Sequence, residues 1–234
     1  MNAHRDTDLS QLTAVVFDMD GLMVDTESIY HAAWRNAAAT LGYTLSDETL
    51  RATTGRPLRD CYQVLQAAVE DAFPMTTFWE LWPRLWYEHI YAHGVAQKPG
   101  LSELLDLLDA HQIPKAVATS TVYQEALFTL QQADIADRFS LIISGDQIVN
   151  GKPAPDIFLR AAEQLGVPPQ SCLAFEDSEA GVLAATTAGM VTIMVPEIRD
   201  PAPQVIQRAY RVLPSLHEAK QLIIEQWLQI GTTS

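Results

Sequence analysis

The chain has 234 residues, 48% of them apolar, and it carries 29 acidic against 15 basic side chains, which gives a formal net charge of -14. A chain of this length and composition can bury a sizeable core in one or two domains, so disorder is not expected. Because no segment is rich in lysine and arginine, neither a nucleic-acid partner nor an anionic membrane surface is expected.

The two cysteines and the hydropathy pattern indicate in which cellular compartment the protein is expected. Cys61 and Cys172 lie far apart and lack the spacing of metal ligands, which fits a reducing cytoplasm. No apolar run reaches the roughly 20 residues that a membrane span requires, and residues 1–10 carry no signal-peptide core. We therefore expect a cytoplasmic protein without a membrane partner, present as a monomer or a weak homodimer.

The first predicted element is a buried strand over residues 15–17, followed at once by Asp18 and Asp20 and then by Gly21. Its short run of Val and Phe is typical of a parallel-sheet strand that is covered on both faces. In an open α/β sheet, ligands bind just beyond the carboxyl ends of the strands, so both carboxylates are expected in a cleft. Two like charges this close repel, and a divalent cation or a lysine would make both tolerable. Taken alone, the sequence Asp-Met-Asp-Gly could equally be an ordinary turn.

Residues 26–96 are predicted to be helical throughout, because apolar side chains recur at helical spacing and β-branched runs are nearly absent. We expect helices from Thr26 to Gly42, from Leu50 to about residue 54, over residues 60–70 and over residues 77–93. A helical block inserted directly after the first strand suggests a second, smaller domain at 26–96, beside a main domain of residues 1–25 and 97–234.

Helical spacing predicts that the aromatic residues of the last helix in this block form a core rather than a base-stacking pocket. These are Phe78, Trp79, Trp82, Trp86, Tyr87 and Tyr91.

From Pro99 onward predicted helices and strands alternate, which implies a parallel sheet with right-handed crossovers and helices on both faces. The fold class is therefore α/β, a Rossmann-like doubly wound parallel sheet core with an inserted α-helical domain. The expected helices cover residues 101–111, 123–132, 155–164, 179–188 and 217–229, and the expected strands cover residues 116–119, 141–144, 173–175, 191–195 and 211–213.

Three further polar stretches follow the predicted strands. Thr119 and Ser120 precede a helix, whose N-terminus is a ready anion site, although helix capping is the other interpretation. Lys152 lies between a glycine and a proline that fix its backbone. Glu176 and Asp177 supply carboxylate oxygens, the ligands that Mg²⁺ prefers, or else they merely complement a helix N-terminus.

Together with the first aspartate pair, these stretches resemble the four motifs of the haloacid dehalogenase superfamily, in the right order. The matching segments are residues 17–21, 118–120, 151–156 and 175–181. The helical block looks like the cap domain of the β-phosphoglucomutase-like branch, which also holds sugar-phosphate phosphatases. The resemblance implies a Mg²⁺-dependent phosphatase that hydrolyses a small phosphorylated metabolite, a sugar, sugar-alcohol or nucleoside phosphate.

The resemblance also implies a role for each catalytic residue. Asp18 would be the nucleophile that takes the phosphoryl group as an aspartyl-phosphate, and Asp20 would be the general acid and then the general base. Thr119 and Lys152 would hold the phosphoryl oxygens, and Ser120 is a further candidate for binding the substrate. Splitting phosphoryl transfer into two steps through a carboxylate makes each step easier.

The metal ligands follow from the same resemblance. Asp18 and Asp177 would bind Mg²⁺ through their carboxylates, and Asp20 through its backbone carbonyl. Glu176 would bind directly or through water. The metal would serve as a Lewis acid and a template.

The inserted block leaves three functions open. The mutases of this branch carry a histidine where this chain has Tyr30 and an arginine where it has Leu58. Because a mutase must protect its phospho-enzyme from water, these departures favour hydrolysis. A β-phosphoglucomutase-type mutase is the first alternative, and a catalytically silent phosphate-binding protein is the second. Candidate contacts to the rest of the substrate are Glu27, Tyr30, Arg56 and Arg59.

Overall fold

The structure is a computed structural model that describes residues 8–54, 58–197 and 201–228. The chain forms two compact units, a core unit of Met1–Val24 with Gln97–Ser234 and a small unit of Asp25–Ala96. Among the described residues, none of the helices has the length and apolar character needed to cross a bilayer.

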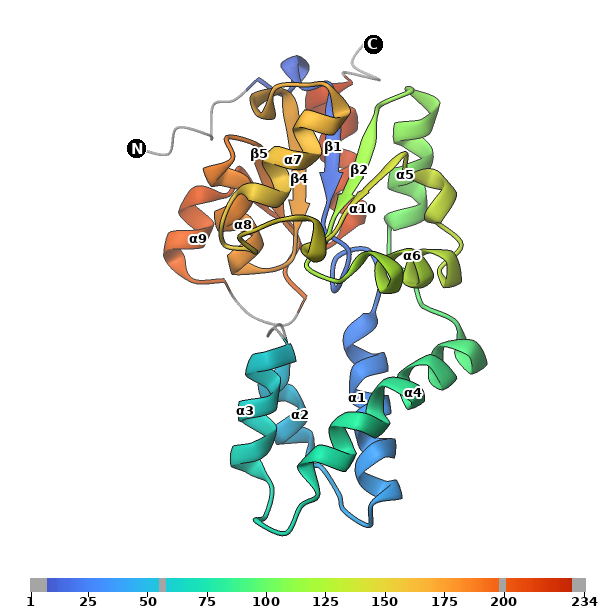
Figure 1. Cartoon of the computed structure of the whole chain (residues 1–234). Coiled ribbons are helices and arrows are strands. Elements are labelled where there is room, and N and C mark those ends of the chain that lie inside the picture. The colour runs from blue at the N-terminus through green and yellow to red at the C-terminus, as the bar shows by residue number, and fades with distance from the viewer. Residues whose placement is uncertain (1–7, 55–57, 198–200, 229–234) are drawn as a thin grey trace. The chain divides into compact units, whose positions relative to one another are not determined.

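The core unit is built on a six-stranded parallel sheet with the strand order β3-β2-β1-β4-β5-β6 (Figure 1). Four of the strands are buried along their whole length, as expected for a parallel sheet covered on both faces. This confirms the predicted α/β fold class. The strands are β1 (Ala14–Phe17), β2 (Lys115–Ala118), β3 (Leu141–Ile143), β4 (Cys172–Glu176), β5 (Val191–Met194) and β6 (Arg211–Val212).

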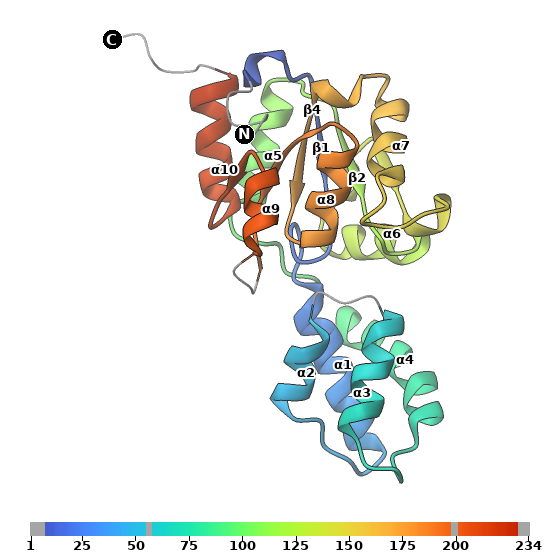
Figure 2. The same cartoon turned by 90° about the vertical axis from the view of Figure 1, so that its left-hand side faces the viewer.

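Helices cover both faces of this sheet, α5 and α10 on one side and α7 and α8 on the other (Figure 2). The helices are α5 (Leu101–Ala110), α6 (Tyr123–Gln132), α7 (Asp156–Leu165), α8 (Glu179–Thr187), α9 (Pro203–Arg208) and α10 (Leu216–Leu222). Short 3-10 helices are η1 (Leu9–Gln11), η2 (Ala136–Arg138), η3 (Gly145–Gln147) and η4 (Pro169–Ser171), and the π-helical turn η5 spans Ile223–Trp227.

Two differences from the expected helices have simple causes. Helix α9 was not predicted, because six residues hold too little of a helical repeat to be recognised. The helix expected over residues 217–229 is α-helical only to Leu222 and continues as η5. A single π-helical turn shifts the backbone hydrogen bonds by one residue and leaves no clear mark in the sequence.

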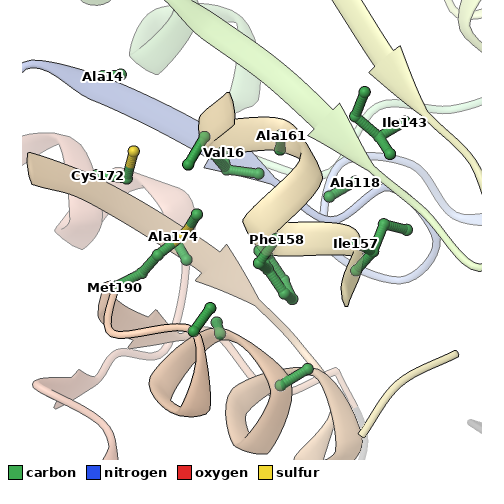
Figure 3. Packing of buried hydrophobic residues seen from close by; sticks show 14 residues of the cluster. Ala14, Val16, Ala118, Ile143, Ile157, Phe158, Ala161, Cys172, Ala174 and Met190 are labelled. Atoms are coloured by element: carbon green, nitrogen blue, oxygen red, sulfur yellow. The ribbon is translucent and has the colours of Figure 1, made fainter. Parts of the chain in front are cut away.

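Helix α7 anchors one face of the sheet. Ile157, Phe158 and Ala161 of α7 are fully buried, and Figure 3 shows them facing the sheet, where they meet small residues of three strands. The short side chains of Ala118 and Ala174 let the helix approach the sheet closely. This contact fixes the start of α7 and, with it, the loop that carries Lys152.

The small unit contains four helices, α1 (Thr26–Thr40), α2 (Asp47–Thr53), α3 (Leu58–Ala68) and α4 (Met75–His93). Asp25 caps α1 by accepting a hydrogen bond from the Ser28 N–H at 3.2 Å. Helix α2 begins three residues before the predicted start at Leu50, because the Ser46 hydroxyl accepts from the Thr49 N–H at 3.1 Å and caps it.

Aromatic side chains form much of the core of the small unit. Phe78 and Trp86 of α4 are buried, and Trp79 and Trp82 pack partly buried around Trp34 of α1. This agrees with the expected core role, except at the end of the helix. Tyr91 was expected in the core, but the residue is 71% exposed, because its neighbour Ile90 takes the inward position.

Two neighbouring residues of α7 test how much the core contact contributes. Phe158 is fully buried and Leu159 is 43% exposed. We expect Phe158→Ala to lower the free energy of unfolding by about 3–5 kcal/mol through lost burial and a new cavity. Leu159→Ala should change it by about 0.5 kcal/mol or less. Urea denaturation followed by circular dichroism measures both, and equal losses would contradict the assigned packing.

Candidate active site

The site lies where the strand order reverses. From β1 the sheet extends to β2 on one side and to β4 on the other, and ligands of open α/β sheets bind at such a point beyond the carboxyl ends of the strands. Asp18 follows β1, Thr119 follows β2, and Asp177 follows β4. The Asp18 N–H donates to Phe175 O at 3.0 Å, so sheet pairing continues into the site. The structure therefore brings together side chains that are more than 150 residues apart.

The Lys152 ammonium is the centre of the hydrogen-bond network. It donates to Asp18 Oδ1, to Glu176 Oε1 at 2.5 Å and to the backbone oxygen of Ala118 at 3.0 Å, which uses all three of its protons. It also lies 5.1 Å from the ring centroid of Phe158. Burial opposes protonation, but the charges of Asp18 and Glu176 outweigh it and raise the pKa of Lys152 above its ordinary value. The lysine is therefore a fixed positive charge.

Glu176 is completely buried and both of its carboxylate oxygens accept hydrogen bonds. Lys152 reaches Oε1, while the Ser178 N–H and hydroxyl donate to Oε2 at 3.2 and 3.0 Å. Gly181 makes room for this carboxylate, since a Cβ at residue 181 would overlap it. Glu176 is thus one of the acidic groups of the site, and its two oxygens already have protein donors.

Asp20 is oriented by two hydroxyl groups. Thr119 Oγ1 and Thr121 Oγ1 donate to Asp20 Oδ2 at 3.1 and 2.8 Å, and the Thr121 N–H donates to Thr119 Oγ1 at 3.0 Å. Thr119 was expected to hold phosphoryl oxygens, and Thr121 was not among the expected site residues. Ser120, between them, is exposed. The two threonines are spaced two residues apart just after β2, and this spacing is the one sequence signal for a shared role.

Three carboxylates could hold a metal ion. Oxygen atoms of Asp18, Glu176 and Asp177 all lie within 4.8 Å of one another. Burial, together with the neighbouring carboxylate charges, raises the pKa of Asp18 and of Asp177 well above the ordinary range. With three carboxylates against one ammonium, a divalent cation would balance the charge, and an all-oxygen donor set suits Mg²⁺. The residues present therefore fit the expected metal.

A fourth carboxylate borders this cluster and was not found by sequence reasoning. Glu197 follows β5, and its Oε1 accepts from Lys98 Nζ at 2.7 Å. Its charge contributes to the raised pKa of Asp177, after burial and the charges of Asp18 and Glu176. No motif marks Glu197, because its approach to Asp177 depends on the path of the loop after β5.

Two of the four candidate substrate residues, Tyr30 and Glu27, have partners within the small unit. The Tyr30 ring packs against Trp34, Trp82 and Trp86, with ring centroids 5.7 to 6.0 Å apart. Glu27 Oε2 lies 3.7 Å from His31 Nε2. Arg56 and the side chain of Arg59, both predicted substrate contacts, lie outside the described residues.

Comparison with known proteins shows the family of the chain. A family model described as haloacid dehalogenase-like hydrolase matches residues 15–195, most of the chain. The chain belongs to the haloacid dehalogenase-like hydrolases. The matched region begins in β1 and ends just after β5, so it includes every strand end that contributes to the site of this hydrolase.

Several known proteins are similar to this hydrolase over most of their length. A phosphorylated carbohydrates phosphatase of Thermotoga maritima is 34% identical over 214 residues, covering 91% of this chain and 90% of the relative. A protein of Drosophila melanogaster named "Probable pseudouridine-5'-phosphatase" is 36% identical over 220 residues, covering 91% and 93%. The crystal structure of a suspected β-phosphoglucomutase from Thermotoga maritima has a TM-score of 0.79 at 31% identity and covers 92% and 99%. These matches confirm the predicted family and support the predicted enzyme class, a phosphatase.

The raised pKa of Asp177 predicts a pH-dependent stability in the absence of metal. A carboxyl whose pKa is higher in the folded than in the unfolded state binds more protons in the folded state. Its contribution to stability therefore falls as the pH rises from about 4 through the raised pKa. In EDTA, Asp177→Asn should therefore raise the thermal unfolding midpoint, and the gain should grow with pH. Calorimetric scans between pH 5 and 8 measure this.

The matched control is Asp137→Asn, which replaces an exposed aspartate of the same unit. It should shift the midpoint little at any pH. A gain for Asp177→Asn that did not change with pH, or a loss at every pH, would contradict the buried, charge-crowded environment assigned to Asp177.

Proposed function

We propose that this hydrolase is a Mg²⁺-dependent phosphatase that cleaves a small phosphomonoester through an aspartyl-phosphate on Asp18. The observation that carries the proposal is the buried contact between Lys152 and Asp18 within a cluster of carboxylates suited to a dication. A lysine fixed on the carboxylate lowers the repulsion that an anionic phosphate would meet there. Positioning and charge neutralisation are the main demands of phosphoryl transfer.

In the first step, an oxygen of Asp18 bonds to phosphorus while the bond from phosphorus to the leaving oxygen breaks. Asp20 gives its proton to the leaving oxygen. In the second step, a water oxygen bonds to phosphorus, the bond from phosphorus to Asp18 breaks, and Asp20 takes the water proton. Thr119 and Thr121 hold one oxygen of Asp20 throughout, which orients the carboxyl group so that its other oxygen can carry the proton.

Asp18 and Asp177 would hold Mg²⁺ with the backbone carbonyl of Asp20, and Glu176 would support them. The metal supplies Lewis-acid stabilisation of the phosphoryl charge. Because both Glu176 oxygens accept hydrogen bonds from Lys152 and Ser178, contact through water suits Glu176 better than direct binding. Lys152 stays protonated and provides a constant positive charge for the phosphate.

The small unit would act as the cap domain that recognises the rest of the substrate. Its four helices form their own core and are inserted between β1 and α5. The names of two relatives, a phosphorylated carbohydrates phosphatase and a pseudouridine-5'-phosphatase, support a sugar or nucleoside phosphate as the substrate. A sugar-alcohol phosphate has the same phosphate and hydroxyl chemistry.

A phosphosugar mutase is the second candidate, because one similar structure is named as a suspected β-phosphoglucomutase. Tyr30 argues against it. The mutases carry a histidine at this position, whereas the Tyr30 ring belongs to the aromatic core of the small unit. Hydrolysis therefore fits this chain better than transfer to a second sugar hydroxyl.

Phosphate release from a panel of phosphorylated sugars, sugar alcohols and nucleosides tests the proposal. Activity should need Mg²⁺ and disappear in EDTA. Asp18→Asn should lower kcat by at least about a thousandfold, since removal of a nucleophile eliminates the covalent route. The exposed Asp137→Asn serves as the control and should match the wild type.

The other outcomes separate the candidates. Conversion of a hexose 1-phosphate to its 6-phosphate without release of phosphate would establish the mutase. Binding of Mg²⁺ and phosphate without turnover of any ester would identify a silent phosphate-binding protein. Unfolding midpoints of the variants check that lost activity reflects chemistry rather than misfolding.

A further inference from the structure

Glu197 is a largely buried carboxylate at the edge of the acidic cluster that has no role in the steps above. Its side chain is 11% exposed, and its Oε1 accepts from Lys98 Nζ at 2.7 Å. The side chain of Lys98 is 25% exposed. Burial of this kind strengthens the attraction within an ion pair. A fully exposed ion pair, by comparison, contributes little to stability.

Lys98 starts from a backbone position that the core unit fixes. Its N–H donates to Met23 O at 2.8 Å, and the neighbouring Gln97 forms an isolated antiparallel bridge with Val24. The segment in which the chain re-enters the core unit is thus hydrogen-bonded to the loop that follows Asp20. The Lys98 ammonium therefore holds one oxygen of Glu197 from a defined place.

Gly21 lets the other oxygen of Glu197 approach Asp177. Gly21 has a φ of +79°, and a Cβ there would lie 2.6 Å from Glu197 Oε2 and closer still to Asp177 Oδ2. The two oxygens thus border the same small space. Because both oxygens lie within 2.6 Å of one point, the distance between them is shorter than two successive O–H···O hydrogen bonds of about 2.8 Å each. The two oxygens are therefore close enough for a single water molecule to donate to both.

We propose that Glu197 is a positioning residue of the metal site, held by Lys98 so that its second oxygen accepts a hydrogen bond from a water molecule beside Asp177. The inference rests on the proposed function, because it takes the carboxylates to bind Mg²⁺. This ion usually keeps several of its own water molecules. Mutation of a group that accepts hydrogen bonds around a metal site typically lowers the metal affinity by about 10- to 100-fold.

The rise of the thermal unfolding midpoint with MgCl₂ concentration gives the Mg²⁺ affinity of the full chain without any substrate. Glu197→Gln keeps the shape of the side chain but removes its charge, and should raise the Kd for Mg²⁺ by about tenfold or more. Glu197→Asp keeps the charge but withdraws the carboxylate by one methylene group. It should also raise the Kd, because position as well as charge is required.

Glu163→Gln is the matched control, since Glu163 pairs with Arg160 on the surface and its side chain is 67% exposed. Its Kd should equal that of the wild type. An unchanged Kd in Glu197→Gln would overturn the inference. A wild-type Kd in Glu197→Asp would also overturn it, because the charge of residue 197 would then matter but the position of its carboxylate would not. If the wild type itself bound no Mg²⁺, the proposed metal site would fail, and this inference with it.

Discussion

The buried ammonium of Lys152 is the interaction on which the site depends. It joins Asp18 after β1, Ala118 at the end of β2 and Glu176 at the end of β4. A buried charge is tolerable only when it is paired and fully hydrogen-bonded, and all three protons of this ammonium have acceptors. Loss of one partner would leave an uncompensated charge and typically costs 3–5 kcal/mol for a buried pair. The same ammonium therefore links the ends of three neighbouring strands and supplies the positive charge of the site.

Close packing of carboxylates requires backbone without side chains at two positions. Gly21 borders Asp177 and Glu197, and Gly181 borders the carboxylate of Glu176. Any larger residue at 181 would displace a fully buried charge. Gly21 also has a left-handed φ of +79°, a backbone conformation that residues with a side chain rarely adopt. Both glycines thus act through the space they leave for charged groups.

Much of the fold and of the core site follows from local pattern. Buried strands in a parallel sheet are short apolar runs, and carboxylates directly after such runs must meet at one edge. The positions of Asp18 and Asp177 at this edge are therefore predictable from the order of residues along the chain. Helix α6 begins at Tyr123 and ends at Gln132, as predicted.

Other features are missed because the apolar periodicity of the sequence does not report them. The start of α2 is set by a capping hydroxyl on Ser46, and α9 is too short for a periodic signal. Thr121 joins the site only because its hydroxyl turns toward Asp20, and Glu197 only because the loop after β5 passes Gly21. These positions reflect side-chain directions and loop paths after the sheet has formed.

The acidic cluster also couples stability to ligand binding. Burial and mutual repulsion raise the pKa of Asp18 and of Asp177, so protons compete with a cation for the same oxygens. A dication that binds the folded state relieves this repulsion and stabilises the protein by mass action. A cation bound there would also lower the electrostatic cost of admitting a phosphate dianion beside Asp18. Metal and substrate would therefore assist each other through the carboxylates, and Lys152 offsets part of the negative charge of the cluster before either binds.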